Sequence, residues 1–230
     1  NGALGNINHI DYNTPERGRS VDEVQRCAMS LVGSVRVILE TASVSTGTAD
    51  EAATTVGGAI EEMLFPVRSI SEGEILQAKQ VMATLDSTEV AAADGVPPEV
   101  EARRTLRLHE VRTTGACTGE FTTVRGGRIL VPLQTIRIGE LTLSAVPAEM
   151  FVEHGLQLKE ATNNPFALMV CPANGYIGYV PTPEAFSQGG YEPALGPGFL
   201  EPDAGETILS TLIKVQSSME RKHDETKVSN

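Results

Sequence analysis

The stretch GRILVPLQTIRIGELTLSAVPAEMF, residues 127–151, decides the fold. Within it LQTIRIGE alternates apolar and polar residues, which is the period of a half-buried strand. Gly139 and Glu140 have the composition of a hairpin turn, and LTLSAVP beyond them is more continuously apolar. The stretch therefore predicts a strand, a tight turn and a second, more buried strand.

Further strands and helices are predicted on both sides of this pair. Strands are expected within residues 52–67 and 166–182. Apolar residues at helical spacing predict amphipathic helices, and Pro98 is well suited to open a short helix of its own. The predicted helices lie within residues 19–43, 71–86, 98–111, 148–162 and 203–225. We expect a mixed α/β (α+β) fold with a layered β-sheet core and flanking helices.

Composition excludes some classes of function. The 230 residues are 40% hydrophobic and 21% charged, which is typical of a globular chain. A net charge of −12 argues against binding to nucleic-acid phosphates, and no apolar run is long enough for a membrane span. The basic cluster of Arg103, Arg104, Arg107 and Arg112 is expected to be a solvated helix face or a contact to the acidic remainder of the chain, rather than a nucleic-acid site. The three cysteines have no metal-binding spacing and are expected to be buried.

Oxygen donors follow two of the predicted strands. Glu149 comes directly after Pro147 and Ala148, and Tyr179 follows the strand that begins near Phe166. Carboxylate and phenolate oxygens suit Zn²⁺ or a similar dication. Two simpler interpretations stay open: Glu149 as a helix-start carboxylate, and Tyr176 and Tyr179 as packed aromatic residues with hydrogen-bonded hydroxyl groups.

Three stretches carry a resemblance to a known family: IRIGELTLSAVPAEMFVEHGLQLKEAT, ANGYIGYVPTPEAFSQGGYEPA and DAGETILSTLIKV. Together they resemble the C-terminal half of the catalytic domain of the neutral/alkaline ceramidases. The opening GALGNINHI is similar to that family's Gly-Asp-Val-Ser-Pro-Asn segment. The resemblance is strong over residues 134–215 and the first ten residues, and weak between residues 40 and 125. Residues 1–230 are thus expected to be a single domain or the C-terminal portion of a larger catalytic domain.

The resemblance implies a zinc-dependent amidase whose metal is held by two histidines, a glutamate and a tyrosine. The family's glutamate falls on Glu149 and its tyrosine on Tyr179. Tyr176 and Tyr191 are expected to contact the substrate, a small-molecule or lipid amide. The Gly- and Pro-rich loop 189–202 is expected to be either a substrate-covering lid or a plain surface loop.

Two departures from the family pattern change what we expect. Asn8 and Asn6 stand at the family's serine and aspartate positions. Asn8 cannot be an activated nucleophile, but it could orient a water or donate to an oxyanion, which is its expected catalytic role. The two histidine ligands have no matching position here, so an N-terminal segment or a second chain is expected to supply them. His154 is expected on a helix surface, and His9 is a weaker candidate for contact with the site.

The chain opens on Asn1, which favours a truncated or proteolytically processed chain that works as part of a heteromer. We expect a zinc-dependent hydrolase of an amide (N-acyl) bond with a substrate other than ceramide itself. Two alternatives remain open: a non-catalytic ceramidase-like binding or assembly module, and an amidase of a small non-lipid substrate. The resemblance alone suggests a secreted or periplasmic location.

Overall fold

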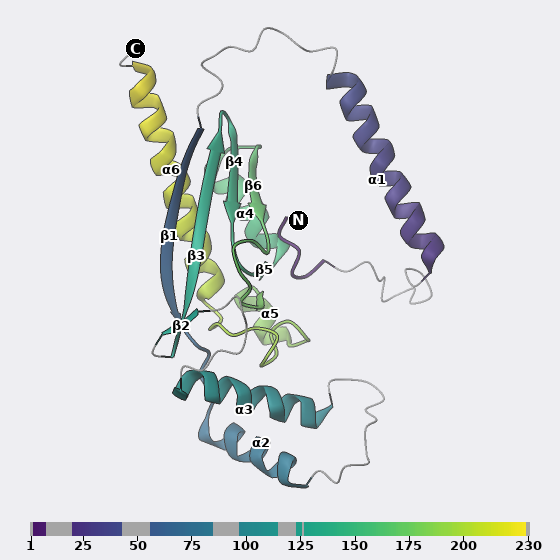
Figure 1. The fold of residues 1–230 in the computed structure, drawn as a ribbon, viewed down its shortest axis with the longest axis vertical. Coiled ribbons are helices and arrows are strands. Elements are labelled where there is room, and N and C mark those ends of the chain that lie inside the picture. The colour runs from purple at the N-terminus through teal and green to yellow at the C-terminus, as the bar shows by residue number, and fades with distance from the viewer. Residues whose placement is uncertain are drawn as a thin grey trace. The chain divides into compact units, whose positions relative to one another are not determined.

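The computed structural model describes residues 2–7, 20–42, 56–84, 97–114, 123–125 and 127–228. The chain divides into two compact units, one of residues 1–6 with 56–230 and the other of residues 7–55. The larger unit holds the β-sheet and the candidate site (Figure 1). The expectation of a single domain, or part of a larger one, stays a prediction.

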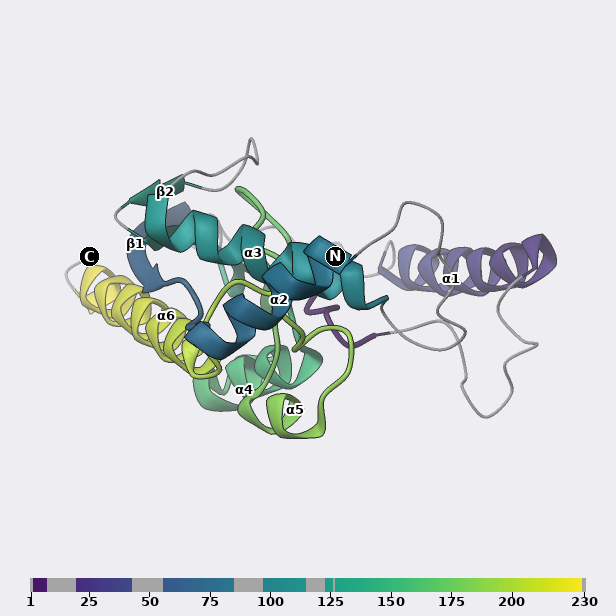
Figure 2. The ribbon, with the colours of Figure 1, turned by 90° about the horizontal axis from the view of Figure 1, so that it is seen from below.

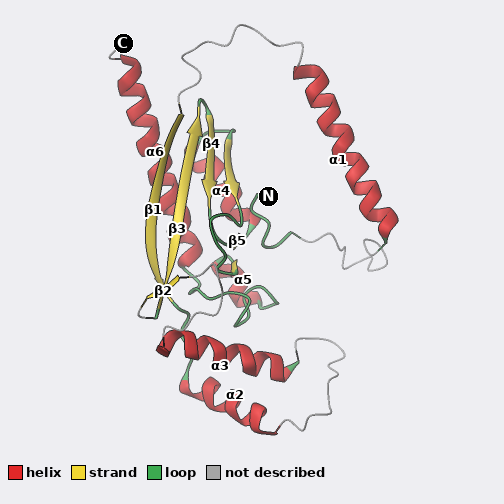
Figure 3. Ribbon diagram, in the orientation of Figure 1, coloured by secondary structure: helices red, strands yellow, loops and turns green. Residues whose placement is uncertain are grey.

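A mixed sheet forms the centre of the larger unit. Its strands are β1 (Val56–Pro66), β2 (Thr123–Arg125), β3 (Arg128–Ile138), β4 (Leu141–Ala145) and β6 (Ala167–Val170). They run in the order β1-β3-β4-β6, with β2 also paired to β3 (Figure 3). β4 is antiparallel to β3 and parallel to β6. The predicted hairpin is confirmed, and Gly139 supplies the positive φ of 59° that its turn requires.

Two helices cover one face of this sheet. α4 (Val152–Thr162) and α6 (Ala204–Val228) lie on the same side in both views (Figures 1 and 2). Alternate residues of β3 turn toward them, and Ile129, Val131 and Leu133 are buried in the core. Within this layer the Gln216 side chain donates to the Ser144 hydroxyl at 2.9 Å. The predicted α/β architecture, a sheet core with flanking helices, is therefore confirmed.

The opposite face of the sheet remains exposed among the described residues. Ile60 is 62% exposed, Leu64 44% and Leu168 39%. Leu64 and Leu168 alternate with buried or half-buried neighbours along β1 and β6, as the pleat of a strand requires. The sheet therefore has one face packed on helices and one apolar face open.

A helix pair completes the larger unit. α2 (Glu72–Thr84) and α3 (Pro98–Thr114) pack against each other and follow β1 along the chain (Figures 1 and 2). α2 begins at a capping box in which the Glu74 amide donates to the Ser71 hydroxyl at 3.2 Å, and the Ser71 amide donates to the Glu74 carboxylate at 2.7 Å. Pro98 opens α3 as predicted, but the helix is 17 residues long rather than short.

The smaller unit contains helix α1 (Val21–Ala42), which confirms the helix predicted for residues 19–43. Its start is capped by the Ser20 hydroxyl, which accepts a hydrogen bond from the Glu23 amide at 3.2 Å. The apolar side chains of its described residues, such as Leu31 at 67% exposed, are open to solvent. A Cβ added at Gly33 meets no described atom within 4 Å, so no other backbone among the described residues approaches this glycine closely.

The structure bears on two expectations from composition, the absence of a membrane span and the burial of the cysteines. A membrane-crossing helix, which needs roughly 20 apolar residues, is not found in the part of the chain that the structure describes. Cys171 is buried as expected, whereas Cys27 is exposed on α1 and its predicted burial is wrong. Cys117 lies outside the described residues.

Candidate functional site

The site is built where β4 and β6 leave the main sheet. A second, two-stranded parallel sheet forms there from β5 (Glu149–Met150) and β7 (Tyr179–Val180). Its register places Glu149 directly beside Tyr179, and the Glu149 amide donates to the Gly178 carbonyl at 2.9 Å. The helix predicted over residues 148–162 therefore begins only at Val152, because Glu149 pairs with another strand instead of coiling. The interpretation of Glu149 as a helix-start carboxylate is therefore wrong, because Glu149 lies in β5 and not in the first turn of α4.

The Glu149 carboxylate lies between two phenols. The Tyr176 hydroxyl donates to Glu149 Oε1 at 2.7 Å. Burial, with the hydrogen bond and charge of Glu149 as further causes, raises the pKa of Tyr179 to about 12. The same causes raise the pKa of Tyr176 above its usual value. Both phenols therefore carry their protons at neutral pH and act as donors toward the carboxylate.

A long loop forms a wall beside Tyr179. We call residues 189–198 the wall loop; it follows α5 (Pro183–Gln188). The Tyr179 amide donates to the Pro197 carbonyl at 2.9 Å, and Gly178 pairs with Gly198 in an isolated β-bridge. The Tyr191 ring meets the Tyr179 ring edge-on, with centroids 5.9 Å apart. The loop therefore lies next to the site, while its role as a lid or a plain surface loop stays a prediction.

The N-terminal segment packs on the other side of Glu149. The Gly5 amide donates to the Met150 carbonyl at 2.8 Å, and a Cβ at Gly5 would stand 2.4 Å from the Glu149 carbonyl oxygen. Only glycine allows this approach. The Asn6 side chain accepts a hydrogen bond from the Val152 amide at 2.8 Å and donates to the Glu153 carboxylate. Asn6 therefore caps α4 from outside the helix.

Two candidates from the sequence cannot be placed. Asn8, the expected catalytic amide, and His9 both lie outside the described residues. Their roles stay predictions. The structure places the remaining candidates, Glu149, Tyr176, Tyr179 and Tyr191, in one cluster, while their functions as metal ligands or substrate contacts also stay predictions.

His154 is not on the helix surface, so that expectation is wrong. Its side chain is 1% exposed, because this face of α4 packs on the first turn of α6. A Cβ at Gly205 would lie 2.6 Å from His154 Nε2, so a glycine makes the room for the ring. Neither ring nitrogen has a hydrogen-bond partner among the described residues, and burial lowers the pKa of the imidazole. In the sequence, Gly205 in the first turn of α6 is the one sign that a large side chain such as His154 packs there.

Two arginines were missed by sequence reasoning. Arg104 was expected on a solvated face, yet its guanidinium lies over the Tyr191 ring, 5.3 Å from the centroid. Arg68 donates to the Pro193 carbonyl and lies 4.9 Å from the centroid of the Phe186 ring. The contacts of Arg104 with Tyr191 and of Arg68 with Pro193 join segments far apart in the sequence, so local sequence patterns do not predict them.

The donor set fits part of a dication site. A carboxylate and a phenol side by side are hard oxygen donors of the kind that Zn²⁺ accepts. Across the described ranges, however, no three His, Cys, Asp or Glu side chains gather in a group that could hold a metal. The residues described here therefore offer two adjacent donors, Glu149 and Tyr179, and any further ligands must come from elsewhere.

Comparisons with known proteins give weak likenesses. No protein-family model matches the chain, and no curated protein matches it. One similar solved structure is a ceramidase complexed with C2, at 24% identity over 56% of this chain and a TM-score of 0.36. Another is the neutral ceramidase of Pseudomonas aeruginosa, at 17% identity over 69% of this chain and a TM-score of 0.37. The chain spans only 20% and 27% of those two chains, and at these values the likeness assigns no activity.

Proposed function

We propose that the protein is part of a zinc-dependent hydrolase that cleaves an amide (N-acyl) bond in a substrate other than ceramide itself. Glu149 and Tyr179 are the proposed metal ligands. Two imidazoles from an N-terminal segment or a second chain complete the set, because a catalytic zinc normally has three protein ligands or more. The observation that supports this most is the β5–β7 register, which sets the carboxylate beside the phenol.

The chain's own residues prepare the two donors. Tyr176 holds one oxygen of Glu149 by its hydrogen bond and so fixes how the carboxylate points. Tyr179, with a pKa of about 12, keeps its proton at neutral pH, so its ligation is linked to proton release. A bound zinc ion would polarise the amide carbonyl and lower the pKa of an attacking water.

Substrate contacts are proposed for two aromatic residues at the rim. Tyr176 and Tyr191 both remain exposed while they contact the ligand candidates Glu149 and Tyr179. An amphipathic phenol can pack on an acyl chain and hydrogen-bond to a polar group at once. Asn8 is proposed as an amide donor to the developing oxyanion, and this rests on the resemblance. A secreted or periplasmic location is proposed on the same basis.

The decisive variant is Glu149→Ala in the intact protein, isolated with any segment or chain that accompanies residues 1–230. We expect loss of zinc binding and of N-acyl amide hydrolysis, since one of the two placed ligands is removed. Glu160→Ala is the matched control, because Glu160 is an exposed carboxylate of α4 away from the cluster. Full activity in Glu149→Ala would contradict the proposal.

Two other functions are separated by simple measurements. Asn8 at the position of the family's serine favours a non-catalytic binding or assembly module, and an intact protein without zinc would support that function. An amidase of small non-lipid substrates is distinguished by a series of N-acyl chain lengths. For a lipid enzyme the rate should fall steadily as the chain shortens, because apolar contacts in the transition state are lost.

A further inference from the structure

Tyr191 is held between two side chains from different parts of the fold. On one side its ring meets Tyr179 edge-on, with an interplanar angle of 81°. On the other side the Arg104 guanidinium, from α3, lies 5.3 Å from the ring centroid. A cation over an aromatic face is attracted by the negative charge density of the ring, and more strongly when water is excluded. Arg104 therefore contacts the site through one intervening ring.

The stem of Arg104 also packs on the wall loop itself. Gly196 has a φ of 101°, and a Cβ there would stand 2.5–2.7 Å from the Cβ, Cγ and Cδ atoms of Arg104. Any other residue at position 196 would collide with this stem and strain the backbone. The loop and the arginine are thus fitted to each other at two points, Tyr191 and Gly196.

One atom of Arg104 is buried at a cost. Its Nη1 is shielded from solvent and has no hydrogen-bond partner in the part of the chain that the structure describes. Leaving a buried donor unpaired is unfavourable, because the group loses its hydrogen bonds to water and gains none in return. A solvated helix arginine has no reason to accept that cost, so the side chain is held in place by its contacts with the loop.

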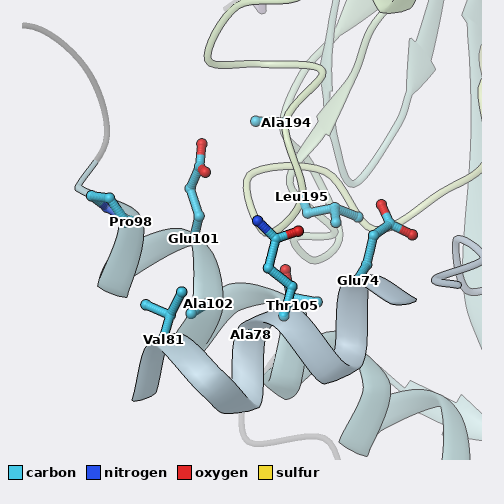
Figure 4. A pocket seen from close by; sticks show the side chains of 10 residues that line it. Glu74, Ala78, Val81, Pro98, Glu101, Ala102, Thr105, Ala194 and Leu195 are labelled. Carbon is cyan, nitrogen blue, oxygen red and sulfur yellow. The ribbon is translucent and has the colours of Figure 1, made fainter. Parts of the chain in front are cut away.

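Residues 194 and 195 of the wall loop lie beside a cavity, although Leu195 also packs against the hydrophobic core. Ala194 and Leu195 border a cavity of about 320 Å³ between α2 and α3, which Figure 4 shows with Ala102 and Thr105 on its helical side. Two arginine contacts hold the loop on either side of these residues. Those contacts are Arg104 and, through the Pro193 carbonyl, Arg68.

We infer that Arg104 is a positioning residue of the candidate site, which acts through Tyr191 to fix the orientation of the Tyr179 phenol beside Glu149. Arg104 touches neither the proposed metal nor the substrate. Its importance for catalysis rests on the proposed function, whereas its effect on the packing of the tyrosines does not.

The tyrosines supply a spectroscopic test that is independent of activity. The chain has no tryptophan and four tyrosines, of which Tyr176, Tyr179 and Tyr191 belong to the cluster. The near-ultraviolet circular dichroism of the full chain therefore reports mainly on the site. Arg104→Met keeps an apolar stem and removes the cation, and Arg103→Met is the matched control on the exposed side of the same helix.

We expect Arg104→Met to lose much of the near-ultraviolet tyrosine signal while the far-ultraviolet spectrum stays that of the wild type. Arg104→Lys, which restores a cation, should recover part of the signal, and Arg103→Met should leave it unchanged. In the intact enzyme, Arg104→Met should lower kcat/KM roughly ten- to a hundredfold, because a proposed metal ligand is misplaced and the Tyr191 ring that contacts the substrate shifts with it.

A wild-type near-ultraviolet spectrum in Arg104→Met would overturn the inference. If Arg104→Met does not fold, Arg104→Gln decides, because it also removes the cation from the Tyr191 ring: an intact fold with a wild-type tyrosine signal in that variant contradicts the inference equally. An altered spectrum in a protein that proves to have no amidase activity would support the positioning role and remove the proposed function, so the two failures are distinguishable.

Discussion

At the scale of single residues, the side chain of Glu149 has two phenol neighbours and a fixed backbone. Its amide donates to Gly178 and its carboxylate accepts from Tyr176, so neither end of the residue is free to turn. A carboxylate fixed in this way needs little further ordering to bind a ligand, which is the advantage of a preorganised site.

His154 gives a prediction on the pH dependence of stability. An unfolded histidine titrates near 6.5, and burial lowers the pKa of His154 in the folded chain, although Glu153 and Glu206 oppose this shift. Below about pH 6.5 the unfolded state therefore binds more protons, and stability falls as the pH falls. His154→Leu should reduce this loss, as measured by urea unfolding at several pH values between about 7.5 and 5. An identical pH slope in wild type and variant would show that the histidine is not buried in this way.

The sequence singled out the residues that the structure brings into one cluster, but it did not predict how they contact each other, and their function in a site stays a prediction. Glu149 and Tyr179 are recognisable because each follows an apolar strand. The hydrogen bond from Tyr176 and the burial of His154 depend on segments far apart in the chain. Arg104 was misjudged because a charge run on a helix is usually solvated, and only the tertiary fold brings Tyr191 over it.

At the scale of elements, the start of α4 depends on a residue from another segment. Its N-cap, Phe151, makes no side-chain capping bond, and Asn6 supplies the acceptor instead. Asn6→Ala should therefore destabilise the fold by about 1 kcal/mol, the usual cost of a lost N-cap. Urea denaturation measures this directly. A stability of Asn6→Ala equal to that of the wild type would disprove the capping role.

Helices were the elements most visible in the sequence. Ser20–Glu23 and Ser71–Glu74 both have the spacing of a capping box. In the structure, the serine hydroxyl accepts a hydrogen bond from the glutamate amide at the start of α1 and of α2. β5 was not visible, because a two-residue strand has no periodicity and exists only by pairing with β7. The helix predicted for residues 148–162 started four residues too early, because α4 begins at Val152 and residues 148–151 are not helical.

At the scale of the whole molecule, the sheet of the larger unit has two unlike faces. Leu133 is buried in the core, whereas Ile60 on the neighbouring strand points to the exposed face. Leu133→Ala should cost about 2–5 kcal/mol of unfolding free energy, because it leaves a cavity in the core. Ile60→Ala should stay within about 0.5 kcal/mol, since little packing is lost. Equal losses in denaturant titrations would mean that the second face is also covered.

Sheet order was the part of the fold that sequence could not supply. The hairpin of β3 and β4 is local and was predicted. The pairing of β1 with β3 and the parallel pairing of β4 with β6 join segments separated by helices, and hydrophobic patterns do not encode such partners. The same non-local pairing brings β5 to β7, and the candidate site is a consequence of it.

The zinc content of the intact protein after equilibrium dialysis, measured by mass spectrometry of the metal, tests the central claim most directly. That claim is that β5 and β7 bring Glu149 and Tyr179 to one metal ion. We predict about one zinc per chain in the wild type and in Glu160→Gln, and a clear loss in both Glu149→Gln and Tyr179→Phe. Full zinc occupancy in those two variants would contradict the claim.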